Sequence, residues 1–396
     1  MTKILGYLKQ FKLYQILIGF FFVCSPLESI SLSEGFSLAK LSSIFVLVGW
    51  AFKGFPYRKS PMITSFWILL GYSILTILWS IDRVNTFLHI TTFLVPSIIL
   101  AIAIKESINS LDVIIFYLGC YVLGCVIMAG TGYFMRDAIL AQASFADQER
   151  LSAFGADQNA MGYLLVVGVA ITLCKYSNAR DAVSKYLCLF VIGLLSIIII
   201  STGSRTGSIM LASTIGLFLI TQKSFKSFFI FVCCLIVAVP LIVNYVPESI
   251  WDRLFQTKQL VDDGNFSGRG DIWAMGLRAL FEENFITGVG YANFTRMLQM
   301  HFNSNWASHN TYLTYLAEFG LVGFWVFLNI LHRIYKYSKN IYRQNHELFI
   351  YIFIVTLLIV MMTLETEYKR WIFMIGVVIE AWYNYKYVNN FKISDR

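Results

Sequence analysis

The chain has 396 residues, of which 57% are hydrophobic and only 14% are charged. This composition excludes an ordinary soluble globular protein and predicts an integral membrane protein. The formal net charge is +8, but the Lys and Arg residues are spread between hydrophobic runs, so membrane topology explains them better than binding to nucleic acid.

Hydrophobic stretches of about 17–25 residues recur along the chain, long enough to cross a bilayer as helices whose backbone groups are bonded internally. The predicted fold class is therefore an all-α integral membrane protein with about twelve transmembrane helices. We expect these helices at residues 13–29, 36–52, 63–81, 86–104, 111–133, 157–174, 186–200, 206–221, 227–245, 309–331, 347–364 and 370–386.

The distribution of charge predicts the orientation of these helices. Lys3, Lys9 and Lys12 precede the first apolar run, which lacks a small-residue cleavage site and is expected to be a retained span. If the N-terminus is cytoplasmic, most basic residues fall in cytoplasmic loops and most acidic residues fall outside. An even number of spans, with both termini in the cytoplasm, follows from this pattern.

One long segment interrupts the series of apolar runs. Residues 246–308 separate a membrane domain at 1–245 from a second one at 309–396. A loop of this length is usually functional. We expect it to be periplasmic and to contain short helices, including an amphipathic one from Arg269 to Phe281.

Three polar residues on the predicted outer face are candidates for chemistry. Arg205, in STGSRTG, presents a planar fork of donors that suits phosphate, although it could also snorkel to the interface. Arg269, in SGRGDIW, begins the loop helix, where anions are favoured, but could pair with Asp271 or Asp263. His309 opens the tenth span and could be a general base or only a capping residue.

The combination of these residues resembles a known family. SGRGDIWAMGLRALFEENFITGVGYANF followed by HNTYLTYLAEFGLVGF looks like the signature of the bacterial O-antigen ligase and polymerase superfamily. The ligase pattern of His, then Asn, Ser or Gln, nine residues, and Gly-x-x-Gly is met by His309, Asn310, Gly320 and Gly323. The STGSRTG run and the DQN at 157–159 also resemble family features.

The resemblance implies a glycosyltransferase of the bacterial inner membrane whose active site faces the periplasm. Such an enzyme moves a glycan from undecaprenyl diphosphate to a hydroxyl of lipid A-core, if it is a ligase, or of a growing glycan, if it is a polymerase. It needs no cofactor and no metal. Arg205 and Arg269 would stabilise the diphosphate, and His309 would position and deprotonate the acceptor hydroxyl.

Four further residues are candidates for substrate binding. Arg278 is a weaker cation candidate, and Asn310 follows the histidine. Trp273 could stack on a sugar, although tryptophan is common at membrane interfaces. Glu318 could orient a sugar or pair with a neighbouring helix.

Two other functions fit parts of this sequence. The polymerase shares the fold and the arginines of the ligase, and only the His-Asn-x9-Gly-x-x-Gly pattern favours the ligase. A polysaccharide flippase or transporter could also have twelve spans, but transporters tend to place ionisable residues near the midplane and to have related halves. Here the charges gather at the outer face and the halves look unalike.

Overall fold

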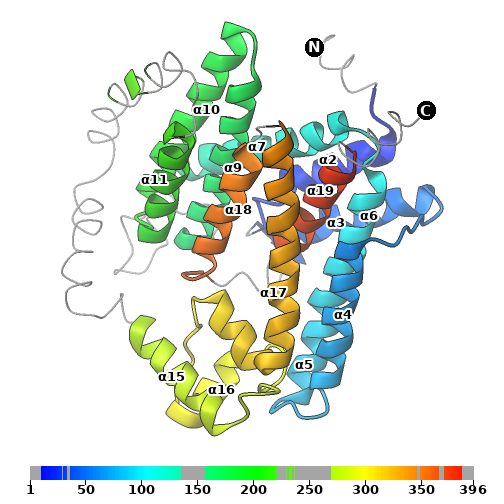
Figure 1. Cartoon of the computed structure of the whole chain (residues 1–396), viewed down its shortest axis with the longest axis vertical. Coiled ribbons are helices and arrows are strands. Elements are labelled where there is room, and N and C mark those ends of the chain that lie inside the picture. The colour runs from blue at the N-terminus through cyan, green and yellow to red at the C-terminus, as the bar shows by residue number, and fades with distance from the viewer. Residues whose placement is uncertain are drawn as a thin grey trace. The chain divides into compact units, whose positions relative to one another are not determined.

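The structure is a computed structural model that describes residues 10–28, 30–33, 36–134, 157–220, 229, 232–233, 236, 269–345, 348–364 and 370–385. It is overwhelmingly helical (Figure 1). Its α-helices are α2 (Leu13–Cys24), α3 (Leu38–Phe52), α4 (Pro61–Thr76), α5 (Arg83–His89), α6 (Val95–Ser107), α7 (Leu111–Phe134), α9 (Gln158–Asn178), α10 (Ala182–Ser201), α11 (Arg205–Ile220), α15 (Arg269–Glu282), α16 (Phe294–Phe302), α17 (Thr311–Asn345), α18 (Leu348–Val360) and α19 (Trp371–Tyr383). A π-helical turn, η1 (Ile90–Leu94), joins α5 to α6.

The described strands are very short. Strand β1 (Ser31–Ser33) pairs antiparallel with β2 (Phe36–Ser37) between α2 and α3. The sequence analysis did not predict this pair, because both strands lie within or beside apolar runs that were assigned to helices.

Each predicted span except 227–245 coincides with a described helix, and that span lies almost wholly outside the described residues. Five helical stretches of the described chain are long and apolar enough to cross a membrane: Arg83–Ser107, Leu111–Phe134, Gln158–Asn178, Ala182–Ser201 and Thr311–Arg343. The other apolar helices are shorter; α2, with 12 residues, rises only about 18 Å at 1.5 Å per residue. A multi-pass membrane protein is supported, and the number of spans stays a prediction.

The chain divides into two compact units. Unit 1 comprises Met1–Gly49, Asp112–Lys258 and Ile341–Thr356, and unit 2 comprises Trp50–Leu111, Gln259–Asn340 and Leu357–Arg396. The predicted division at 245 and 308 concerns position relative to the bilayer and stays a prediction.

Unit 1 is held together by close helix packing at small residues. Gly124 of α7 lies against the carbonyl of Val23, and a Cβ at Gly168 of α9 would lie 2.8 Å from the sulfur of Cys125. Small residues let helix backbones approach closely, which increases van der Waals contact where the solvent gives no hydrophobic driving force.

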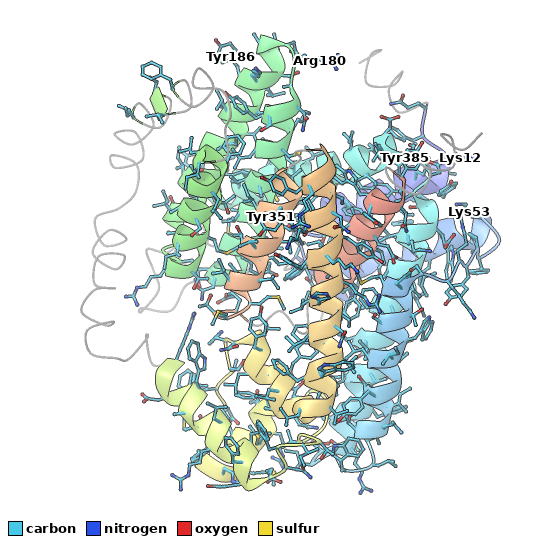
Figure 2. The ribbon with its side chains drawn as sticks, in the orientation of Figure 1. Lys12, Lys53, Arg180, Tyr186, Tyr351 and Tyr385 are labelled. Carbon is cyan, nitrogen blue, oxygen red and sulfur yellow. The ribbon has the colours of Figure 1, made fainter. Side chains whose placement is uncertain are left out.

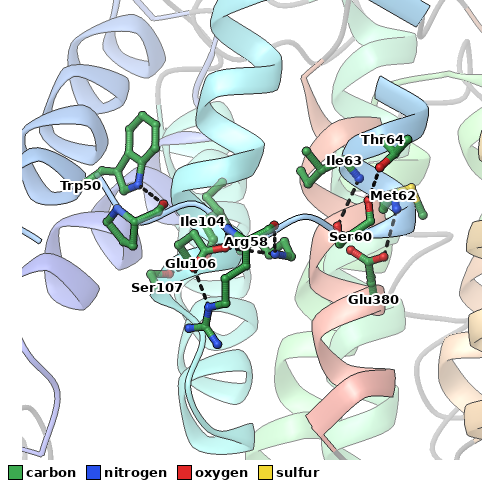
Figure 3. Close-up of polar contacts among 12 residues, drawn as sticks. Trp50, Arg58, Ser60, Met62, Ile63, Thr64, Ile104, Glu106, Ser107 and Glu380 are labelled. Atoms are coloured by element: carbon green, nitrogen blue, oxygen red, sulfur yellow. Dashed lines mark hydrogen bonds and ion pairs between the residues drawn. The ribbon is translucent and has the colours of Figure 1, made fainter. Parts of the chain in front are cut away.

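One end of unit 2 is organised by two buried carboxylates (Figure 3). Glu106 accepts ion-pair hydrogen bonds from Arg58 at 3.1 Å and from Lys105 at 3.0 Å. Glu380 of α19 accepts a bond from the backbone N–H of Met62 at 3.0 Å, at the start of α4. Figure 2 shows Lys53 and Tyr385 at this same end, away from α5, α15 and α16.

The opposite end of unit 2 gathers other connections. Hydrogen bonds join the turn between α4 and α5 to the loop before α16. Other hydrogen bonds join the start of α17 to the turn after α18. Helix α4 therefore runs from the end with Lys53, Arg58 and Lys105 to the opposite end, and the continuous stretch of α5, η1 and α6 runs back.

We predict that Glu106→Gln lowers the free energy of unfolding by about 1–2 kcal/mol, because the amide cannot compensate Arg58 and Lys105. Thermal unfolding of the detergent-solubilised protein measures this. The control is Glu282→Gln, which breaks an ion pair whose two side chains are 72% and 46% exposed. If both variants lost the same free energy of unfolding, the role given to Glu106 would be contradicted.

Candidate active site

Helix α15 carries two of the predicted site residues on one side. Its buried residues recur at helical spacing, which is why it forms and packs as an amphipathic helix; they are Ile272, Gly276, Ala279 and Leu280. Arg269 and Trp273 are one turn apart on this helix. The guanidinium of Arg269 donates to the carbonyl oxygen of Thr363 at 3.0 Å, and the indole N–H of Trp273 donates to that of Ser308 at 2.9 Å.

His309 lies in a tight turn just before α17. Its φ of 47° is in the left-handed region, which costs a non-glycine residue energy and persists only where neighbours enforce it. The Ser308 hydroxyl supplies that constraint by accepting from the Asn310 N–H at 3.0 Å. The Asn310 side chain in turn accepts from the Leu313 N–H at 3.1 Å and so caps α17. The entry to α17 is thus held from both sides of the histidine.

The turn at residues 361–364, after α18, joins these two elements. It accepts the bond from Arg269 through Thr363. It also accepts from Thr311: the Thr311 N–H donates to the carbonyl of Met361 at 2.9 Å, and its hydroxyl to that of Leu364 at 2.6 Å. The structure therefore brings Arg269, Trp273, His309 and Asn310 together around the 361–364 turn.

This arrangement combines groups with complementary chemistry. A guanidinium can hold phosphate oxygens, an imidazole can take a proton from a hydroxyl near neutral pH, and an indole face can support a sugar ring. The guanidinium and the indole are each anchored to a backbone carbonyl, so their positions do not depend on long flexible contacts.

Helix α17 is broken at Gly320, where φ is 61° and ψ is −168°. A Cβ at this position would collide with the carbonyl of Ile286. The break frees backbone groups, which residues 285–290 satisfy through hydrogen bonds from Val289 to Ala317 (2.9 Å), Gly290 to Glu318 (2.9 Å), Leu321 to Phe285 (3.1 Å) and Val322 to Ile286 (3.4 Å). We call this set of bonds between residues 285–290 and 317–322 the clasp.

The second glycine of the predicted Gly-x-x-Gly pattern also has a packing role. A Cβ at Gly323 would overlap the ring of Tyr72 in α4. The hydroxyl of Tyr72 donates to the carbonyl of Phe319 at 2.9 Å, so α4 is fixed beside the break in α17.

Sequence reasoning missed the turn between α4 and α5. Asn293 is fully buried and donates to the hydroxyls of Ser80 at 2.7 Å and Thr86 at 2.8 Å. Asn85 adds a bond to the carbonyl of Ala292 at 2.6 Å. A sequence signal was present, because the segment SIDRVNT between two apolar stretches is rich in polar residues. Nothing in the sequence linked this segment to the loop.

Two predicted substrate-binding residues lie away from the 361–364 turn. Glu318 is fully buried, and its carboxylate accepts from the Phe294 N–H at 3.2 Å, at the start of α16. Arg278 is nine residues from Arg269 and so on the opposite side of α15. It pairs with Glu282 at 3.0 Å, and this hydrogen bond is the main cause of the lowered pKa of Glu282. Their role with substrate stays a prediction.

Arg205 belongs to unit 1, where it begins α11. The preceding Ser204 donates to the side-chain oxygen of Asn159 at 2.9 Å. A Cβ on Gly207 would lie 3.2 Å from the Cα of Gly162, so the starts of α9 and α11 are in close contact. The DQN and STGSRTG motifs therefore lie side by side, and the catalytic role of Arg205 stays a prediction.

Some predicted features lie outside the described residues. They are residues 246–268 of the loop, including Asp263.

Comparison with known families gives one match. Residues 189–328 match the family model described as O-antigen ligase. Over this stretch, about a third of its length, the chain is similar to the O-antigen ligase family. A comparison with curated proteins finds no match.

The matched stretch contains Arg205, Arg269, His309 and the whole clasp. The resemblance predicted from the sequence is confirmed there, and the DQN motif at 157–159 lies outside it. The match supports a membrane enzyme of the ligase or polymerase type in the O-antigen pathway.

We predict that Gly320→Ala lowers the free energy of unfolding by at least about 3 kcal/mol, because alanine cannot adopt this backbone conformation without strain and would collide with Ile286. Thermal unfolding and folded yield in detergent measure the effect. The control is Gly71→Ala in α4, where an added Cβ meets nothing within 4 Å. If the Gly320→Ala protein had the thermal stability and folded yield of the wild type, the clasp would not depend on this glycine.

Proposed function

We propose that the protein transfers a glycan from undecaprenyl diphosphate to an acceptor hydroxyl at the periplasmic face of the inner membrane. The favoured reaction is that of an O-antigen ligase, which joins O-polysaccharide to lipid A-core. One structural observation supports it most directly: Arg269 and the entry of α17, which carries His309, are both bonded to the 361–364 turn.

Arg269 serves the donor in this proposal. Diphosphate is a good leaving group, so the enzyme mainly has to hold it and stabilise the negative charge that develops as it departs. A guanidinium fixed to the carbonyl of Thr363 is pre-oriented for this task. Arg205 is assigned the same role from its sequence context, at the start of an apolar helix.

His309 serves the acceptor. Its imidazole takes the proton of the acceptor hydroxyl as the oxygen attacks the anomeric carbon of the donor glycan. The bond between that carbon and the diphosphate oxygen breaks, and undecaprenyl diphosphate leaves with the bonding electrons. The imidazolium then passes the proton to water, which restores the base.

Trp273 and Asn310 are the substrate-binding residues nearest to this chemistry. The bond from the indole N–H to Ser308 fixes the orientation of the Trp273 ring, which suits stacking on a sugar. Arg278 and Glu318 are retained as more remote substrate contacts. Both termini are proposed to be cytoplasmic, so that the 361–364 turn faces the periplasm.

The alternative is a polymerase that adds repeat units to a growing glycan. It would use the same arginines and the same histidine, and it differs only in its acceptor. The sequence pattern formed by His309, Asn310, Gly320 and Gly323 favours the ligase.

We predict that His309→Ala lowers the transfer rate by about 10²–10⁴-fold, because the acceptor loses its base. Arg269→Ala lowers it by about 10²–10³-fold, because the leaving charge is no longer stabilised. Arg269→Lys restores only part of the rate, since an ammonium lacks the planar fork. Transfer from a lipid-linked donor to purified acceptor, in proteoliposomes, measures these rates.

The matched controls are His301→Ala, which removes a surface histidine bonded to Glu282 and Glu283, and Arg83→Ala in the exposed outer turn. Both are expected to stay near the wild-type rate. In a deletion strain, long chains on the carrier with bare lipid A-core identify a ligase, whereas single repeat units on lipid A-core identify a polymerase. Normal activity of His309→Ala and Arg269→Ala would refute both assignments.

We further predict that transfer does not require a divalent metal. Extensive treatment with a chelator, followed by assay in chelator, should leave the rate within about two-fold of the untreated enzyme, since fixed cationic side chains supply the charge stabilisation. A loss of activity that Mg²⁺ or Mn²⁺ restores would overturn this part of the mechanism.

A further inference from the structure

An exposed apolar surface crosses from α15 to α17 in unit 2. It consists of Phe281, Phe285, Ile286, Leu321, Val322 and Trp325, and we call it the apolar strip. Phe281 is 66% exposed, Ile286 61% and Trp325 68%. Contiguous exposed apolar side chains of this size mark a binding or membrane-contact surface.

The apolar strip is continuous because its two halves are bonded together. The rings of Phe281 and Phe285 stack, with centroids 4.8 Å apart. The backbone bonds of the clasp then place Phe285 beside Leu321 and Ile286 beside Val322. Trp325 is one turn further along α17. The polar residues between the two phenylalanines have other partners, since Glu283 bonds His301 and Asn284 accepts from the Ile286 N–H.

Helix α15 has apolar side chains that stay exposed as well as those that are buried in unit 2. Its buried side, with Ala279 and Leu280, faces the rest of unit 2. Phe281 and Leu277 lie on a second, exposed apolar edge, and beyond it come the charged residues Arg278 and Glu282. A helix with a buried side, an apolar edge and a charged side is the type that lies at a membrane surface.

Hydrocarbon is the occupant that fits the apolar strip. The strip continues on α17 through Trp325 and Leu328, on the exposed face of a helix long and apolar enough to cross the membrane. The outward side chains of such a span contact acyl chains. Because the clasp places Phe285 and Ile286 beside Leu321 and Val322 of that same helix, the same hydrocarbon extends to Phe281 and Ile286.

We infer that the apolar strip lies in the acyl chains of the bilayer lipid, so that α15 rests along the membrane surface. This inference does not depend on the proposed reaction. It gives α15 a fixed depth, with Phe281 in hydrocarbon and the charged side of the helix toward the headgroups.

The test uses photo-crosslinking in the full-length protein in its membrane. Benzoylphenylalanine replaces Phe281, an exposed aromatic position that tolerates a larger ring, and the adducts formed on irradiation are identified by mass spectrometry. The matched control places the same group at Thr295, an exposed polar position on α16. We expect phospholipid adducts at position 281 and several-fold fewer at 295.

Several results would overturn the inference. Equal yields of lipid adduct at the two positions, or none at 281, would show that the strip is not in hydrocarbon. A cross-linked dimer at 281 would show that a second copy covers the strip. An adduct with a polyprenyl lipid in place of phospholipid would assign the surface to a carrier chain.

Discussion

The break in α17 at Gly320 is the constraint on which the rest of unit 2 depends. A helix interrupted in or near a bilayer leaves backbone donors and acceptors that must find partners. Residues 285–290 supply them from a loop some 30 residues earlier, and the two glycines at 288 and 320 make the close approach possible. Because the loop is tied to the break, α15 and α16 are held at one end of unit 2 (Figure 1).

The candidate site is rigid because the loop that carries it is bonded to α17 and because its own side chains are bonded to the backbone. Arg269, Trp273 and Thr311 each donate to a backbone carbonyl, and those carbonyls belong to only two short segments, Ser308 and the 361–364 turn. A site oriented in this way does not have to reorganise when charge develops in a reaction. The left-handed backbone conformation of His309 fits this picture, because such a conformation persists only where surrounding contacts enforce it.

Much of the fold could be predicted from the sequence, because apolar runs of helical length have few alternatives in a membrane. The closeness of α15 to the His309 turn, seen in the bond from Trp273 to Ser308, could also be anticipated, since both flank one polar segment. The clasp could not be predicted, because the φ of Gly320 is set by Ile286 and its neighbours, and the bonds of Asn293 to Ser80 and Thr86 cross more than 200 positions. The partner of Glu318 could not be predicted for the same reason, since only packing shows that it bonds the start of α16.

The clasp also limits how the molecule can be divided. The acceptors for Val289 and Gly290 lie in α17, and the hydroxyls that hold Asn293 belong to Ser80, before α5, and Thr86, within α5. A fragment containing only residues 246–308 would leave these groups to water and would lose the fixed spacing between Arg269 and the entry of α17. The loop is therefore not an independent module that can be excised, exchanged with that of another enzyme or expressed alone without the helices to which it is bonded.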